Sequence, residues 1–184
     1  MSLPTQPQAQ QVWSLGLRLL HWTLAVSMIT SFATHELSLQ WHEWTGYVAL
    51  AAATMRIVLG LWGAGYWRFS QFVRSAAATA AYARDIAAHR ERRYLGHNPL
   101  GAWMVLALLA DAVGTGLTGW LYTTDQFWGV AWVGNLHAVL GHALIPLVVL
   151  HLAGAVFTSW RHKENLVAAM LHGRKRSEPD TAPH

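Results

Sequence analysis

The sequence predicts an all-α membrane protein, a bundle of four transmembrane helices with both termini in the cytoplasm. Three observations point to this fold. Four long apolar segments occupy most of the chain, which is 53% hydrophobic and only 12% charged. The Lys and Arg residues are absent from two of the three connections between those segments. Most of the eleven Trp residues lie near the ends of the segments, as they do in membrane bundles.

The four apolar segments are residues 15–34, 44–64, 100–122 and 136–160. Each is long enough to cross a hydrocarbon core of about 30 Å as a helix. Together they leave no room for a separate soluble domain, so residues 1–184 are expected to form one membrane domain. The first segment is too long for a removable signal peptide and lacks a small-residue cleavage site, so we expect it to be retained.

The distribution of charge predicts the orientation. The first and third connections contain no Lys or Arg and carry Glu36, Glu43 and Asp125 instead, whereas the central loop and the tail are rich in Arg. By the positive-inside rule, the central loop and both termini face the cytoplasm. The formal net charge of +4 therefore reflects membrane topology, and we expect lipid rather than nucleic acid as the partner of the basic regions.

The central loop contains an Ala-rich stretch without helix breakers at residues 75–88. This composition predicts an amphipathic helix on the cytoplasmic surface. With Arg74, Arg84 and Arg90 it either lies on anionic lipid headgroups or forms a solvated connector. The tail after Gly173 is charged and contains Pro, so it is expected to be loose.

The histidines within the apolar segments form a pattern. His137 and His151 are fourteen residues apart, and a helix turns about 100° and rises about 1.5 Å per residue, so both lie on nearly one face about 21 Å apart. Their predicted depths match those of two other histidines. His21 pairs with His151 near the cytoplasmic side, and His42 pairs with His137 near the outer side. Two axial imidazoles at each of two depths are what two stacked non-covalent haems require.

Other residue types limit the cofactor classes. The chain has no Cys, which excludes covalently attached c-type haem, thiolate-held iron–sulfur clusters and disulfides. No Gly-rich phosphate loop is present, so nothing indicates a nucleotide site. These absences leave the paired histidines as candidate ligands of non-covalent haem.

Some assignments stay open at this point. His35 lies fourteen residues after His21 and is an alternative outer ligand; His42 is favoured because it opens a cleaner helix and Gly46 follows it. His142 faces elsewhere on the fourth segment and is expected to make a structural hydrogen bond. We interpret the pairing as His21 with His151 and His42 with His137.

Three charged residues lie inside or beside the apolar segments. Arg56 and Arg18 are candidates to bind haem propionates, or they reach the lipid headgroups instead. Asp111 lies near the middle of the third segment, where a carboxylate is uncommon. It is either protonated or bonded to Thr115 one turn on, and a role in proton handling is a further possibility.

Several stretches resemble a known family. They are residues 19–22 (L-L-H-W), 42–47 (H-E-W-T-G-Y), 96–104 (G-H-N-P-L-G-A-W-M), 135–151 with its two histidines, and 161–176 (R-H-K-E-N-L-V-A-A-M-L-H-G-R-K-R). The chain resembles the bacterial di-haem cytochrome b family that includes the cytochrome b subunits of nickel–iron hydrogenases. The polar stretches 96–104 and 161–176 are the most specific.

The resemblance implies two b haems held by His21, His42, His137 and His151. It also implies a multi-pass protein of the bacterial inner membrane, part of a respiratory chain. Electrons would pass between the quinone pool and a periplasmic redox protein such as a c-type cytochrome or a hydrogenase. Whether the chain is itself an enzyme with quinone oxidoreductase activity stays open at this point.

Two other functions compete with this one. A superoxide:quinone oxidoreductase would need cationic residues to attract superoxide at the outer face, and the outer connections have no Lys or Arg. A non-redox transporter or assembly protein would explain the helices and the charge bias. It would not explain four histidines at two matched depths.

Overall fold

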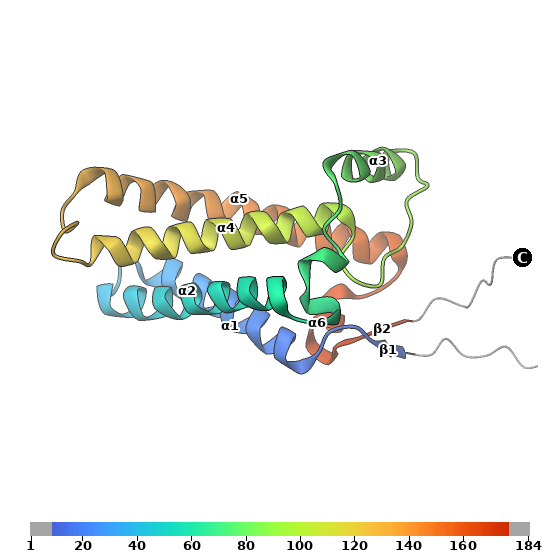
Figure 1. Ribbon diagram of the computed structural model, residues 1–184, viewed down its shortest axis with the longest axis horizontal. Coiled ribbons are helices and arrows are strands. Elements are labelled where there is room, and N and C mark those ends of the chain that lie inside the picture. Colours follow the sequence, from blue (N-terminus) through green and yellow to red (C-terminus); the bar gives the residue numbers. More distant parts are fainter. Residues whose placement is uncertain (1–8, 177–184) are drawn as a thin grey trace, which may run out of the picture.

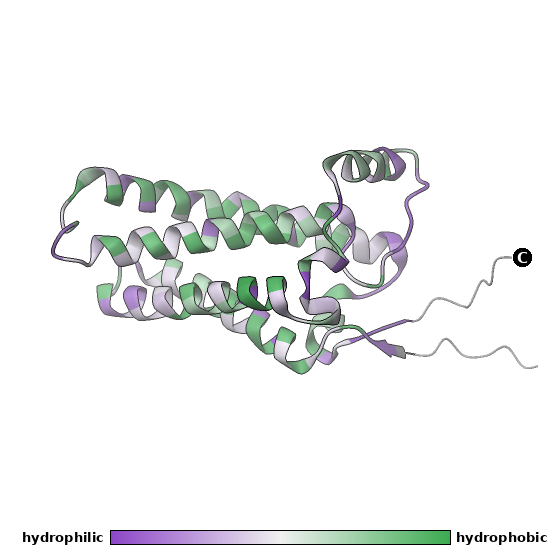
Figure 2. Cartoon of the chain, viewed as in Figure 1, coloured by the Kyte–Doolittle hydropathy of each residue, from purple (hydrophilic) through white to green (hydrophobic). Residues whose placement is uncertain are grey.

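The computed structural model describes residues 9–176. Its four long helices are α1 (Leu15–Thr34), α2 (Leu39–Trp62), α4 (Pro99–Tyr122) and α5 (Ala131–His162). Each is long and apolar enough to cross a membrane. They run side by side (Figure 1), and in the hydropathy view α4 and α5 are mostly green, whereas α1 and α2 mix green with paler and purple residues (Figure 2). The predicted four-span all-α fold is confirmed.

Two of the helices begin earlier than hydropathy alone predicts, because their first turns are polar or aromatic. The N-cap of α2 is Ser38, whose side chain accepts a hydrogen bond from the Trp41 amide, so α2 starts five residues before residue 44. His42 therefore lies inside the first turn of α2. The start of α5 at Ala131 also precedes the expected boundary, residue 136, by five residues. Hydropathy finds the membrane-embedded part of a helix but not its polar first turn.

The four helices form two antiparallel hairpins, α1 with α2 and α4 with α5 (Figure 1). The hairpins meet where α2 packs against α4, around Ala53, Leu109 and Ala112. No extended packing joins α1 to α5 in the described part of the chain. A seam with little direct helix-to-helix packing is thus left between α1–α2 and α5.

The two ends of the bundle differ. One end consists of the connections between α1 and α2 and between α4 and α5, and we call it the hairpin end. The other, the terminal end, carries the short helices α3 (Ala76–Ala87) and α6 (Leu166–His172), the 3-10 turns Gly65–Trp67 and Phe69–Gln71, and strands β1 (Ala9–Gln11) and β2 (Arg174–Arg176).

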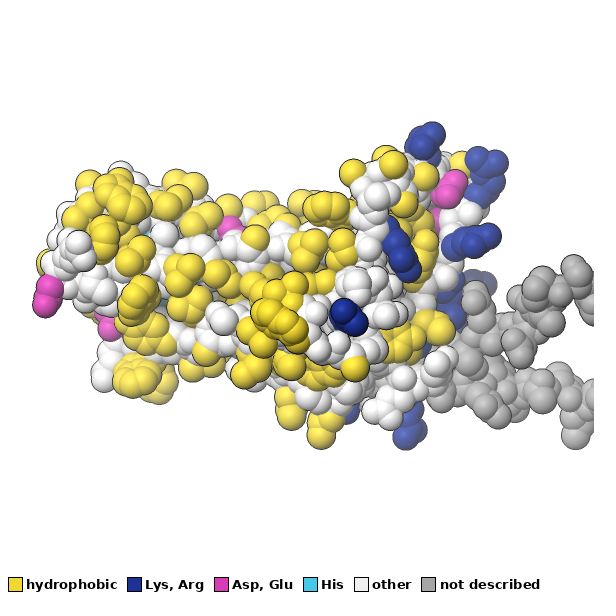
Figure 3. All heavy atoms as spheres, in the orientation of Figure 1, with side chains coloured by type: hydrophobic (Ala, Val, Ile, Leu, Met, Phe, Trp, Pro, Cys, Tyr) yellow, Lys and Arg dark blue, Asp and Glu magenta, His cyan; other side chains and the backbone are white. Residues whose placement is uncertain are grey.

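Basic side chains gather at the terminal end on the face that Figure 3 shows. An acidic side chain lies at the opposite end, and the bundle between is largely apolar on this face. The pattern agrees with the charge bias of the sequence. The assignment of the terminal end to the cytoplasm remains a prediction from the positive-inside rule.

The expected surface helix forms as α3, with Ser75 as its N-cap. It is tied to the bundle by a hydrogen bond of 3.1 Å from Trp103 Nε1 to Thr79 Oγ1. Figure 1 shows it set apart from the four long helices.

The expectation of a loose tail after Gly173 is wrong for residues 174–176. Strand β2 pairs antiparallel with β1, and the Gly173 carbonyl accepts hydrogen bonds from the amides of Val12 (2.9 Å) and Trp13 (3.0 Å). Gly173 has a φ of +83°, and a Cβ there would come within 2.4 Å of the Trp13 carbonyl oxygen, so only glycine fits the turn. The rest of the tail lies outside the described residues.

Candidate functional site

The structure brings the four predicted histidines together as two pairs. The rings of His21 on α1 and His151 on α5 have centroids 6.4 Å apart and planes at 47°; we call them the inner pair. The rings of His42 on α2 and His137 on α5 have centroids 5.8 Å apart and planes at 89°; we call them the outer pair. All four side chains are half-buried. Each pair bridges the seam where the helices have little direct packing.

The outer pair has its ring orientation fixed by backbone carbonyls. Nδ1 of His42 lies 2.9 Å from the Ser31 carbonyl oxygen, and Nδ1 of His137 lies 3.0 Å from that of Thr115. A carbonyl only accepts, so each Nδ1 carries the proton and donates. The lone pair is then on Nε2, the nitrogen left free to bind a metal.

A glycine makes room for the outer pair. A Cβ on Gly119 would come within 2.9 Å of His137 Cε1, so the ring fits only because α4 has no side chain at that position. Gly46, one turn after His42, is not needed for space, because a Cβ there would make an ordinary contact of 3.6 Å with Ser31 Oγ. The Ser31 hydroxyl is also 3.2 Å from His42 Nδ1 and donates to the His42 carbonyl.

The inner pair lacks such acceptors. In the described part of the chain neither His21 nor His151 makes a hydrogen bond through its ring. The side chains around His21 instead bind α6. Arg18 donates to the carbonyl of Leu171, and Trp22 Nε1 donates to that of Met170 at 3.3 Å. These two hydrogen bonds attach the C-terminal end of α6 to α1, at residues that precede and follow His21 in the sequence.

The spacing of both pairs fits a metal ion between the rings. Two imidazoles that bind one iron from opposite sides at about 2 Å place their ring centres about 6 Å apart. The α5 backbone is also uncrowded one turn after each ligand. Gly141 and Gly154 lie one turn after His137 and His151, and a Cβ on either would meet no atom within 4 Å. The spacing of the histidine pairs and the sparse packing between α1–α2 and α5 fit a flat macrocycle at each level.

Among the described residues, no three His, Asp or Glu side chains gather as a metal-binding group. A haem needs only two protein ligands, because its ring nitrogens supply the other four. Pairs rather than clusters are therefore the pattern that suits this cofactor.

A match to a known family identifies the family of this chain. The model of the prokaryotic cytochrome b561 family matches residues 12–173. The chain belongs to that family. It is therefore a multi-pass bacterial membrane protein whose family binds b-type haem and carries electrons across the membrane. No curated protein matches the chain.

The two predicted propionate ligands lie toward the terminal end of the bundle, as the inner pair does. Arg56 is only 8% exposed; it donates to the Trp67 carbonyl at 3.0 Å and lies over the Phe69 ring. Arg18 binds the Leu171 carbonyl, and its Nε is buried without a partner in the described part of the chain. Neither makes an ion pair with an acidic residue of the described chain.

Three other residues can now be placed. His35 bonds the Phe32 carbonyl and pairs with the exposed Glu36, away from the two pairs. His142 bonds the Ala138 carbonyl at 2.7 Å, as expected of a structural histidine. Asp111 is buried, but its Oδ2 and the Thr115 hydroxyl both lack hydrogen-bond partners among the described residues, so the second of the two alternatives for Asp111, a bond to Thr115, is wrong.

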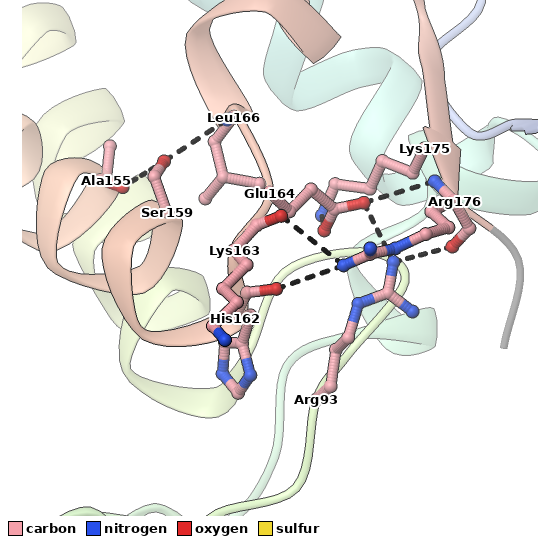
Figure 4. Close-up of polar contacts among 9 residues, drawn as sticks. All are labelled: Arg93, Ala155, Ser159, His162, Lys163, Glu164, Leu166, Lys175 and Arg176. Carbon is pink, nitrogen blue, oxygen red and sulfur yellow. Dashed lines mark hydrogen bonds and ion pairs between the residues drawn. The ribbon is translucent and has the colours of Figure 1, made fainter.

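The terminal end is closed by buried ion pairs, which Figure 4 shows around Glu164. Glu164 accepts from Arg93 at 2.8 Å and from the Arg176 amide at 3.2 Å, and it lies 3.8 Å from Lys175 Nζ. Burial lowers the pKa of Lys175, which Glu164 partly offsets. The ion pairs thus join β2 to the loop before α4 and to the end of α5.

A second ion pair closes the same end. Glu91 accepts from Arg161 at 2.5 Å, and the hydrogen bond from Arg161 lowers the pKa of Glu91 to about 2. Its carboxylate side chain is only 3% exposed. Both acidic residues therefore bridge elements that are distant in the sequence.

Sequence reasoning missed the partners of the outer histidines and the ion pairs of the terminal end. The Ser31 and Thr115 acceptors are backbone carbonyls, which leave no residue-type signal. The polar stretch 161–176 did signal the importance of the tail, but not which loop it binds. The polar stretch 96–104 likewise signalled His97, whose role was not assigned.

Proposed function

We propose that this protein carries electrons across the bacterial inner membrane through two b-type haems, between the quinone pool and a periplasmic redox protein. The observation that carries the proposal is the pair of facing histidines at each of two levels of one seam. The family membership supports haem b and transmembrane electron transfer. When bound, a bis-imidazole haem supplies a one-electron carrier.

The residues of the chain have distinct roles in this proposal. His42 and His137 hold the outer haem, and His21 and His151 hold the inner one. His137 and His151 lie on the same helix about 21 Å apart, so α5 fixes the spacing of the two levels. Ser31 and Thr115 keep the outer imidazoles in the tautomer that leaves Nε2 free. Arg56 and Arg18 supply positive charge for propionates of the inner haem.

The deciding experiment is the haem b content of the purified protein, measured as pyridine haemochrome per chain. We expect a ratio near two. A ratio near one would mean that one pair is structural, and the path across the membrane would be lost. No haem after expression with ample haem would favour a non-redox transporter or assembly protein.

A second measurement tests the electron path. Protein in liposomes with a reduced quinone in the bilayer is expected to reduce a membrane-impermeant acceptor, such as an oxidised c-type cytochrome, on the hairpin side. Rapid consumption of superoxide with quinone reduction would favour the superoxide:quinone oxidoreductase instead. The connections at the hairpin end carry no Lys or Arg to attract that anion, which is why we rank it second.

A further inference from the structure

The polar stretch at residues 96–104 is explained by the fold at all but one of its polar positions. The side chain of Asn98 is the N-cap of α4 and accepts from the Gly101 amide at 2.7 Å, and Pro99 occupies the first turn. A Cβ on Gly96 would approach the Tyr66 ring at 3.2 Å. His97 has no such explanation, because no hydrogen bond involves its ring in the described part of the chain.

The ring of His97 is packed between aromatic side chains, but in the described part of the chain its Nδ1 makes no hydrogen bond. It lies between Trp13, at 4.9 Å between centroids, and Phe72, at 4.7 Å. One edge of the side chain keeps some exposure, but Nδ1 is buried and has no partner. Leaving a buried polar nitrogen unpaired costs about 1–3 kcal/mol. An apolar side chain would avoid that cost, so the position favours a ligand that supplies the missing partner.

His97 lies in a positively charged neighbourhood at the terminal end, the end of the bundle that also carries the inner pair. Burial first, then the charges of Arg56 and Lys175 and the nearby His151 and His21, lower the pKa of His97 to about 3. The imidazole is therefore neutral and carries one N–H. Arg18 borders the same corner, with its Nε 3.2 Å from where a Gly173 Cβ would lie, next to the Trp13 carbonyl.

Acidic side chains do not balance this charge in the described part of the chain. Arg18 and Arg56 donate only to backbone carbonyls. Glu164 already interacts with Arg93, Lys175 and the Arg176 amide. A group bound at the inner pair that carries a carboxylate would meet one unpaired nitrogen from Arg18 and one from His97.

We propose that His97, together with Arg18, donates hydrogen bonds to a propionate carboxylate of the haem held by the inner pair. The inference rests on the proposed function, because it needs a haem at His21 and His151. His97 is then a positioning residue. It fixes the carboxylate edge of the macrocycle and offsets its negative charge, which favours the reduced haem.

The test compares the wild type with His97→Phe, His97→Gln and a control, His142→Phe, in the intact purified protein. Phenylalanine keeps the aromatic contacts with Trp13 and Phe72 and removes both nitrogens, whereas glutamine keeps an N–H donor. His142 lies on α5 but belongs to neither pair. The readouts are haem b per chain and a potentiometric titration that resolves the two haems.

We expect all four proteins to keep two haems. In His97→Phe the ratio of reduced to oxidised inner haem at a fixed potential should fall about threefold, as expected for a weakened charge offset. The outer haem should not change, and His97→Gln should restore most of the ratio. Fewer than two haems in the wild type would overturn the proposed function itself.

With two haems in the wild type, three results would overturn the role of His97. The first is an unchanged titration and an unchanged KM for quinol in His97→Phe. The second is an unchanged titration with a raised KM for quinol, which would assign His97 to the quinone. The third is loss of the inner haem in both His97→Phe and His97→Gln, which would show a packing role. Loss in His97→Phe with retention in His97→Gln would support the proposal.

Discussion

The outer and inner histidine pairs are held in different ways. Each outer ring donates to a backbone carbonyl of a neighbouring helix, so its orientation is set by the fold of the bundle. Among the described residues the inner rings have no such acceptor, and their surroundings are built by the cap at the terminal end: α6, the β1–β2 sheet and the ion pairs of Glu164 and Glu91. The comparison shows that one site depends on helix packing and the other on contacts made by the ends of the chain.

The largest expected effect is the loss of single haems. His137→Ala should remove the outer haem and His151→Ala the inner one, each leaving about one haem b per chain, because one imidazole cannot hold a low-spin bis-ligated iron. The measurement is haem content with the optical spectrum of the remaining haem. The matched control is His142→Ala on the same helix, which should keep both. Retention of two haems in His151→Ala would contradict the inner assignment.

The choice between His42 and His35 tests the outer pair. His42→Ala should halve the haem content, because His42 faces His137 across the seam. His35→Ala should leave it unchanged, because His35 is engaged with the Phe32 carbonyl and Glu36. Haem content and the axial-ligand signals in electron paramagnetic resonance measure both. The reverse result would move the outer ligand to α1.

A third substitution tests whether only the inner level depends on the cap. Glu164→Gln leaves the buried Arg93 and Lys175 without their counter-charge, which should destabilise the protein by about 3 kcal/mol. We expect a lower Tm and preferential loss of the inner haem, read from haem content after mild heating. Glu36→Gln, at an exposed position of the hairpin end, is the control and should do neither. Equal loss of both haems would mean that the cap supports the whole bundle.

The smallest expected effect is a loss of stability at low pH. The folded-state pKa of Glu91 is lowered to about 2 from its ordinary 4.5 by its hydrogen bond from Arg161. The stability it contributes is therefore complete above pH 4.5 and is lost as the pH falls toward 2. Hydrogen exchange of residues 88–96 should rise in that range in the wild type. In Glu91→Gln it should be higher already at neutral pH and should rise less on acidification, because only the ion pair of Glu164 with Arg93 remains to titrate there.

Much of the candidate site could be predicted from the sequence. The fourteen-residue interval between His137 and His151 predicts that both lie on one face of an apolar helix, at two different depths. The distribution of Lys and Arg predicts the direction of the other helices, which puts His21 at the depth of His151 and His42 at that of His137. The role of Arg56 as a propionate ligand stays a prediction. Of the two alternatives for Asp111, the bond to Thr115 does not form, because spacing brings two side chains to one face without orienting their polar atoms.

The sequence by itself determined the four spans, the depth of each histidine and the sign of the charge at each end. These are one-dimensional properties, since hydropathy, helical rise and the count of Lys and Arg are all read along the chain. The tertiary structure alone decided which rings face each other, which carbonyls fix the outer tautomers and how the tail closes over the inner level. Those features depend on how the helices rotate and pack against one another, and a backbone carbonyl at Ser31 or Thr115 has the same chemistry as any other until packing brings an imidazole to it.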